Sequence, residues 1–75
     1  MAKGPLTYVG RGRITEIRGA DTPARRRMIE MGATPGAYVE IVRVAPGKDP
    51  VQAALRGYAL TLRRADAENI IVDDE

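Results

Sequence analysis

Glycine and proline divide this chain into short segments along its whole length. The 75 residues include eight glycines and five prolines, and no stretch resembles a linker, an internal repeat or a low-complexity run. Short segments with short connections are typical of strands and small helices in one folding unit. We therefore expect a single domain over residues 1–75, with its core within 12–72 and a disordered acidic tail at 73–75.

The number of large apolar side chains limits what this domain can bury. Apolar residues make up 44% of the chain, but 11 of them are alanine, so 22 remain to build a core. A chain of this length buries only about 60% of the surface that it exposes when unfolded, which leaves room for one core of about ten to fifteen side chains. A buried catalytic cleft with its own supporting residues is therefore not expected.

The first predicted strand covers residues 13–18, which are rich in β-branched side chains and lie between two glycines. Ile14 and Ile17 are three positions apart, so strict alternation would place them on opposite faces of a sheet. A β-bulge near Thr15 would bring both isoleucines to the buried face.

A short helix is predicted after this strand. Asp21 or Thr22 can cap its N-terminus, and Pro23 suits the first helical position because the first N–H groups of a helix lack partners in any case. Gly32 suits the left-handed residue beyond the last turn. Ala24, Met28 and Met31 fall at i, i+4 and i+7 and form one apolar stripe, which we expect to face the core.

The rest of the chain alternates apolar and polar residues between turn signals. Valines at positions 42 and 44 indicate that the second face of their strand is partly covered. The predicted elements are a type II turn at 34–36, a strand over 37–45, a turn-rich loop at 45–50, two hairpin strands meeting at 56–58, a short helical turn at 64–69 and a closing strand at 70–72.

Five short strands are too few for a β-sandwich. A sheet of this size hides its edges best by closing on itself. The predicted fold class is therefore mainly β: a small five-stranded SH3-like barrel with one short helix inserted after the first strand.

Missing residue types exclude most catalytic and metal chemistry. The chain contains no cysteine, histidine or tryptophan, which removes disulfides, thiol nucleophiles, the commonest general base and the commonest transition-metal ligand. No phosphate-binding glycine loop of the G-x-x-x-x-G-K-[ST] type is present, and the threonines have no histidine to activate them. We predict that the protein is not an enzyme, has no catalytic residue and holds no cofactor or metal.

The charge distribution narrows the choice of partner. The net charge is +2, but residues 1–72 contain twelve basic and seven acidic residues and so carry +5. Acidic proteins, anionic membranes and nucleic acids all attract such a surface. The three tyrosines do not alternate with the arginines, as they would in a protein that binds single strands. An RNA- or ribosome-binding barrel is therefore kept only as the second hypothesis.

The chain has no apolar run of about 20 residues. Membrane insertion is therefore not expected, and we predict a cytoplasmic location.

The order of several short motifs resembles the FeoA family, small cytoplasmic components of bacterial ferrous iron uptake. The resemblance extends from about Gly12 to Val72 and rests on the conjunction, since no single dipeptide is specific. The matching residues are Met31-Gly32, Pro35-Gly36, Ala45-Pro46, Asp49-Pro50, Arg56-Gly57, Leu60, Leu62 and Arg63-Arg64. Two positions depart from the family pattern: Ala33 replaces a larger apolar residue, and Gly47-Lys48 replaces Leu-Gly.

The resemblance implies an SH3-like fold and a non-catalytic accessory role. FeoA-like proteins are thought to dock on FeoB, a membrane permease with a GTPase domain, and to support or regulate ferrous iron transport. The family is often described as binding transition metals, but without histidine or cysteine we predict no tight site in the monomer. A stand-alone relative of the SH3-like domain of metal-dependent repressors is a further alternative, and a homo-oligomer is left open.

For the docking surface we predict the helix, its exit turn and the loop that departs from the family pattern. Three consecutive arginines provide electrostatic steering, whereas Met28 and Met31 belong to the core. The predicted partner-binding residues are Arg25, Arg26, Arg27, Pro35, Gly36, Gly47 and Lys48.

Overall fold

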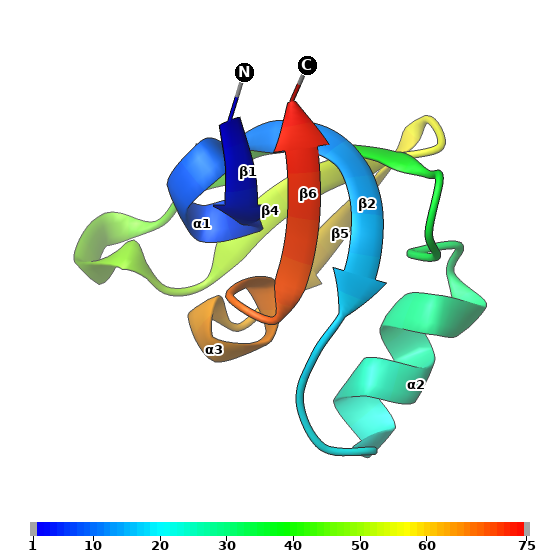
Figure 1. Cartoon of the computed structure of the whole chain (residues 1–75). Helices are drawn as coiled ribbons and strands as arrows, with labels where there is room; N and C mark the ends of the chain where they lie inside the picture. Colours follow the sequence, from blue (N-terminus) through cyan, green and yellow to red (C-terminus); the bar gives the residue numbers. More distant parts are fainter. Residues whose placement is uncertain (1, 75) are drawn as a thin grey trace.

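The computed structural model describes residues 2–74, which form one curved antiparallel sheet with short helices around it (Figure 1). The strands are β1 (Ala2–Pro5), β2 (Arg11–Ile17), β3 (Tyr38–Val44), β4 (Val51–Leu55), β5 (Tyr58–Leu62) and β6 (Ile70–Asp74), in the spatial order β1-β6-β2-β3-β4-β5. The helices are α1 (Leu6–Val9), α2 (Pro23–Glu30), α3 (Arg64–Ala67) and the 3₁₀ turn η1 (Pro46–Lys48). The mainly β prediction is confirmed.

Strand β2 pairs with different strands along its two halves. Its first residues pair with β3, and its later residues pair with β6. The pairing with β6 shifts register between Ile14 and Glu16, so the bulge predicted near Thr15 is confirmed. Because of this shift, Ile14 is buried and Ile17 also packs against the core.

Gly12 lies where the pairing of β2 changes from β3 to β6, and there is no room for a side chain at this position. A Cβ atom at Gly12 would lie 2.6 Å from the carbonyl oxygen of Asp73, and the φ angle of Gly12 is +149°. Glycine is therefore the residue that lets β2 approach the backbone of β6 this closely.

Helix α2 begins at the predicted cap and ends just before the predicted glycine. The Thr22 hydroxyl accepts a hydrogen bond of 3.1 Å from a backbone N–H of the first turn, and Pro23 is the first helical residue. Gly32 lies beyond the last turn with φ of +103°. Met28 is buried and Met31 packs against the core, as the apolar stripe predicts.

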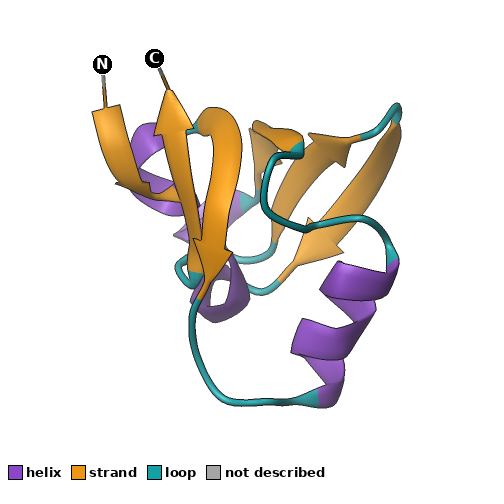
Figure 2. Cartoon of the chain, turned by 45° about the vertical axis from the view of Figure 1, so that its right-hand side comes forward, coloured by secondary structure: helices purple, strands orange, loops and turns teal. Residues whose placement is uncertain are grey.

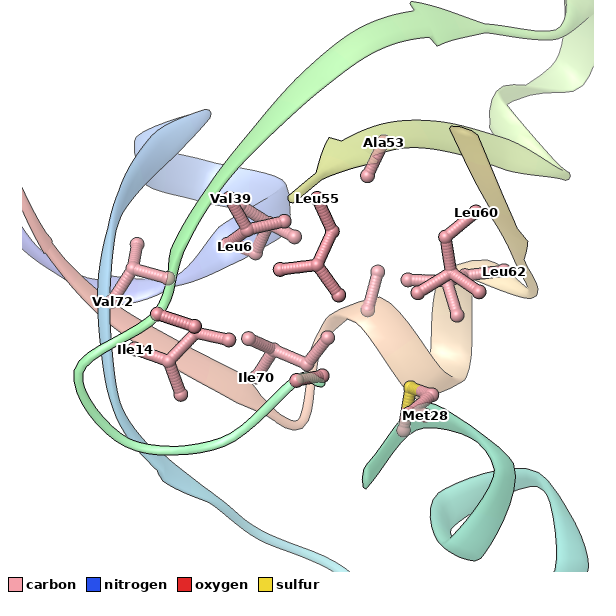
Figure 3. Close-up of a cluster of buried hydrophobic side chains, with 13 residues drawn as sticks. Leu6, Ile14, Met28, Val39, Ala53, Leu55, Leu60, Leu62, Ile70 and Val72 are labelled. Atoms are coloured by element: carbon pink, nitrogen blue, oxygen red, sulfur yellow. The ribbon is translucent and has the colours of Figure 1, made fainter. Parts of the chain in front are cut away.

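The core is built from the inner faces of the strands and one side chain or more from each of the three helices (Figure 3). The largest fully buried side chains are Leu6, Ile14, Leu55, Ile70, Val39 and Val72. None of the buried residues in the described range 2–74 is polar or charged. The core is therefore built from apolar side chains, and the one polar side-chain atom buried without a partner among the described residues is Nε of the half-buried Arg25.

Sequence reasoning missed the first two elements. Residues 2–5 form β1 beside β6, and the following α1 directs Leu6 into the core, where it is 0% exposed. Gly4 and Pro5 have low strand propensity, but an edge strand tolerates proline because the backbone groups on its outer side need no partner strand. The sheet thus has six strands rather than five, and its edge strands β1 and β5 do not pair with each other.

The same pairing corrects the prediction of a disordered acidic tail. Asp73 and Asp74 are the last residues of β6 and pair with Lys3 and Ala2 of β1. The prediction is wrong for these two residues because a strand partner near the N-terminus was not recognised. Glu75 lies outside the described residues.

The predicted partial cover of the second face of β3 still leaves both of its valines exposed. The side chains of Val42 and Val44 are 55% and 48% exposed. The pairing of β3 with β4 shifts register between Ile41 and Arg43, so the alternation behind that prediction is broken there.

Replacing Gly12 with alanine tests whether the close approach of β2 and β6 depends on glycine at this position. We expect Gly12→Ala to lower the free energy of unfolding by about 3 kcal/mol, since the new methyl group meets the Asp73 backbone. Gly10→Ala is the matched control, because Gly10 also has positive φ but has open space around its Cβ position. Urea denaturation should give about 1 kcal/mol for the control, and equal losses for the two variants would contradict the close approach.

Candidate functional site

The three consecutive arginines of α2 have three different environments. Arg25 is half-buried, and its Nη2 donates to the carbonyl of Ile17 at 3.3 Å. Arg26 donates to both carboxylate oxygens of Asp21, at 3.0 and 3.1 Å, and this holds the pKa of that carboxyl below its ordinary value. Arg27 is exposed and has no acidic partner among the described residues. The arginines therefore do not form one patch, and Arg27 is the member that is exposed and makes neither an ion pair nor a side-chain hydrogen bond with the described residues.

The turn after α2 has the predicted conformation and is bound to β2. Gly36 has φ of +94°, and the N–H of Ala37 donates to the carbonyl of Thr34, which closes the turn. The Gly36 carbonyl accepts from Arg13, and the Gly36 N–H donates to the Ile14 carbonyl. Pro35 and Gly36 are exposed, but the backbone of this turn serves to join β2 to β3.

The loop that contains Gly47-Lys48, the second departure from the family pattern, is exposed. Gly47 has φ of +84° with open space at its Cβ position, and Lys48 follows with φ of +70°. The N–H of Lys48 donates to the Ala45 carbonyl at 2.8 Å. The other departure, Ala33, is 1% exposed and belongs to the core, so only Gly47 and Lys48 change the surface.

An open groove of about 530 Å³ lies between α2 and the segment that runs from β5 into α3. The apolar side chains of Met28, Leu60 and Leu62 line it, and Figure 3 shows Met28 on the side of the core nearest these leucines. Arg27 lines it from α2, and Arg63 lines it from the end of β5. Of the predicted partner-binding residues, Arg27 lines this groove. Leu60, Leu62 and Arg63 also line it, although the sequence predicts for them only a place in or at the end of a strand.

A second hollow continues from the groove. It is lined by Arg43, Pro46 and Gln52, and it shares Pro50 and Thr61 with the groove. The structure therefore brings Arg27 and the loop at residues 45–50 to adjoining parts of one surface. The other predicted residues line neither hollow: Arg25, Arg26, Pro35, Gly36, Gly47 and Lys48.

Two side chains from the β4–β5 hairpin hold the C-terminal end of α2. The Tyr58 hydroxyl donates to the Met31 carbonyl, and Arg56 Nε donates to the Gly32 carbonyl at 3.4 Å. Figure 2 shows α2 standing below the sheet, connected to it by loops at both ends. Together with the hydrogen bond from Arg25 to the Ile17 carbonyl, these contacts hold both ends of α2 beside the groove.

Among the described residues, no group of three or more acidic, histidine or cysteine side chains is arranged to hold a metal ion. In the same range, no helix is both long and apolar enough to cross a bilayer. The surface features that remain are the groove, the adjoining hollow and the unpaired cations around them.

Residues 7–74 match the FeoA domain family. This chain belongs to the FeoA family. The match begins within α1, at Thr7, and ends at Asp74, the last residue of β6, so it includes both walls of the groove. Membership of the FeoA family implies a role in ferrous iron transport.

Solved structures of FeoA proteins share this fold. The solution structure of FeoA from Chlorobium tepidum is 32% identical to this FeoA-family chain, with a TM-score of 0.80 over 95% of this chain and 73% of that one. The crystal structure of Stenotrophomonas maltophilia FeoA with zinc is described as an SH3 domain protein. It has a TM-score of 0.72 at 24% identity, over 84% of this chain and 78% of that one. The SH3-like class is therefore confirmed.

One relative joins FeoA to a transporter in a single polypeptide. The Fe(2+) transport protein A/Fe(2+) transporter FeoB fusion protein of Porphyromonas gingivalis is 41% identical over 49 residues. These residues are 65% of this FeoA-family chain and 6% of the fusion protein, so the chain corresponds to a small part of that relative.

The hydroxyl of Tyr58 tests the anchoring of α2. We expect Tyr58→Phe to lower the free energy of unfolding by about 1 kcal/mol, because the Met31 carbonyl loses its donor. It should also speed amide hydrogen exchange in α2. Tyr8→Phe is the control, since Tyr8 is 84% exposed, and it should change neither quantity. Unchanged exchange in both variants would show that this contact does not hold the helix.

Proposed function

We propose that this protein is a non-catalytic accessory of bacterial ferrous iron uptake that docks, in the cytoplasm, on the GTPase part of an FeoB-like permease. The observation that carries the proposal is the relative in which FeoA and FeoB are one polypeptide. A short linker keeps two joined domains at an effective concentration in about the millimolar range. With or without such a linker, docking requires a surface of this chain that binds the partner.

The electrostatics of the surface support binding to an acidic partner. Arg27, Arg43 and Arg63 line the two adjoining hollows, and no acidic side chain in the described part of the chain pairs with them. Unpaired exposed cations raise the rate of encounter with a negatively charged partner and weaken complexes with a positive one.

For the contact residues we propose two groups. Arg27, Gly47 and Lys48 lie on or beside the adjoining hollows and contact the partner directly. The other four residues of the predicted docking surface act through the position or charge of α2 and its exit turn: Arg25, Arg26, Pro35 and Gly36.

Direct titration tests the docking. We expect isothermal titration of the intact chain with the soluble GTPase part of the FeoB-like permease from the same organism to show a saturable complex. Arg27→Glu with Lys48→Glu should weaken it about tenfold, because two exposed cations that face the partner are reversed. Lys3→Glu with Arg18→Glu is the control, since it changes the net charge equally at residues outside both hollows and outside the loop at residues 45–50.

Absence of binding, together with normal ferrous iron uptake in a strain lacking the protein, would contradict the proposed function. Binding that falls equally in both double variants would keep the function but move the contact away from the hollows. Salt-dependent retention of RNA without any binding to the GTPase part would favour the RNA-binding alternative instead.

Metal titration tests whether the protein itself holds iron. Carboxylates are the only strong ligands in the chain, and the described ones do not gather in a group of three. We therefore expect titration with Fe²⁺ under anaerobic conditions, or with Zn²⁺, to show no binding at micromolar concentrations. Saturable binding of either ion at such concentrations would contradict this.

A further inference from the structure

The outer edge of β5 has no backbone partner. Strand β5 is last in the sheet order and pairs only with β4. Outside that pairing, no residue from 58 to 62 makes a backbone hydrogen bond with the described part of the chain. Alternate residues of a strand direct their N–H and C=O groups away from the neighbouring strand, so this edge presents a row of free donors and acceptors.

The two edges of the sheet differ in how they are protected. β1 has four residues, and it includes Lys3, Gly4 and Pro5, which discourage pairing with another strand. β5 has no proline and no charged residue, and its pairing with β4 continues without a bulge. The β5 strand therefore lacks three of the usual devices that keep a further strand away: a proline, a charged side chain and a bulge.

The groove runs along this unprotected edge. It is lined by three consecutive residues of β5, Leu60, Thr61 and Leu62. Their side chains alternate between the two faces of the sheet, so a hollow that meets all three follows the edge of the strand. Helix α2 forms the opposite wall with Ala24 and Met28. A segment added beside β5 would thus lie between a sheet edge and a helix, with apolar side chains beneath it.

The charges at the groove select among segments that could pair there. Arg27 and Arg63 are exposed on opposite walls, and neither makes an ion pair with any residue in 2–74. Arg43 adds a third cation in the adjoining hollow, and Asp66 is the one carboxylate among the residues that line either hollow. Acidic side chains on the added segment would be stabilised by this excess of positive charge.

A second copy of this chain fits the edge less well than an acidic peptide does. Antiparallel pairing of β5 with β5 of another copy would supply no acidic side chain to Arg27 and Arg63, because β5 contains no charged residue. Such pairing would leave these cations without partners, whereas an acidic peptide would pair with them.

We propose that the β5 edge binds an extended peptide segment of a partner, in which acidic residues alternate with apolar ones. The added segment continues the sheet through main-chain hydrogen bonds, and the pockets and cations beside the edge select its side chains. This inference concerns a surface of this chain and is independent of whether the permease is the partner.

A synthetic peptide tests the inference without any natural partner. The probe is a nine-residue acetylated and amidated peptide of alternating glutamate and valine, titrated into ¹⁵N-labelled intact protein. We expect amide shifts of residues 58–63 and of α2, with a measurable dissociation constant. The same sequence N-methylated at every residue should bind at least about tenfold more weakly, because none of its amides can donate the hydrogen bonds that extend a sheet.

Charge reversal completes the test. Arg27→Glu with Arg63→Glu should raise the dissociation constant about tenfold. Lys3→Glu with Arg18→Glu should change it less than about twofold, since neither residue lines the groove. Both arginines are exposed, so the variant should keep its circular dichroism spectrum and melting temperature.

Four results would overturn the proposal. They are equal binding of the N-methylated peptide, equal binding of a lysine–valine peptide, shifts confined to residues outside the groove, and no shift at millimolar peptide. Dimerisation through residues 58–62, seen as shifts that depend on protein concentration, would replace the peptide with a second copy. An RNA oligonucleotide that shifts the same amides at lower concentration than the peptide would assign the edge to nucleic acid.

Discussion

Strand β2 pairs with β3 over its first residues and with β6 over its later ones, and the positions of the other elements follow from this division. Gly12 makes the approach to β6 possible, and the register shift near Thr15 keeps Ile14 and Ile17 in the core. The turn after α2 is tied to the same strand, since the N–H of Ile14 donates to the Ala37 carbonyl at 2.8 Å. The sheet therefore curves around the core and ends at β5, with α2 opposite that edge (Figure 1).

The parts of the fold that depend on local chemistry could be predicted from the sequence. The Thr22 cap, the first-turn Pro23 and the glycine beyond α2 act within a few residues, and so does the hairpin between β4 and β5. Strand β1 could not be predicted in this way. Gly4 and Pro5 oppose it locally, and its stability comes from pairing with β6 at the other end of the sequence. The burial of Leu6 depends on that same pairing.

The candidate site shows a similar limit. The sequence points to three adjacent arginines, but it contains no sign that Arg25 bonds the Ile17 carbonyl or that Arg26 pairs with Asp21. Both contacts depend on how the loop before α2 returns to the end of β2. Arg63 follows an alternating strand and reads as an ordinary solvent-facing residue, yet tertiary structure places it opposite Arg27 across the groove. Which cations stay unpaired is therefore a property of the fold.

Together, these features describe an SH3-like domain with an apolar core, whose distinctive surface is one strand edge beside one helix. For a member of a ferrous iron transport family, such a surface is suited to binding a partner. The most direct test is to map the contact on the ¹⁵N-labelled chain with the GTPase part of the FeoB-like permease. The account predicts amide shifts in β5, in α2 and in the loop at residues 46–50. Shifts confined to β1, β6 and α1 would contradict it.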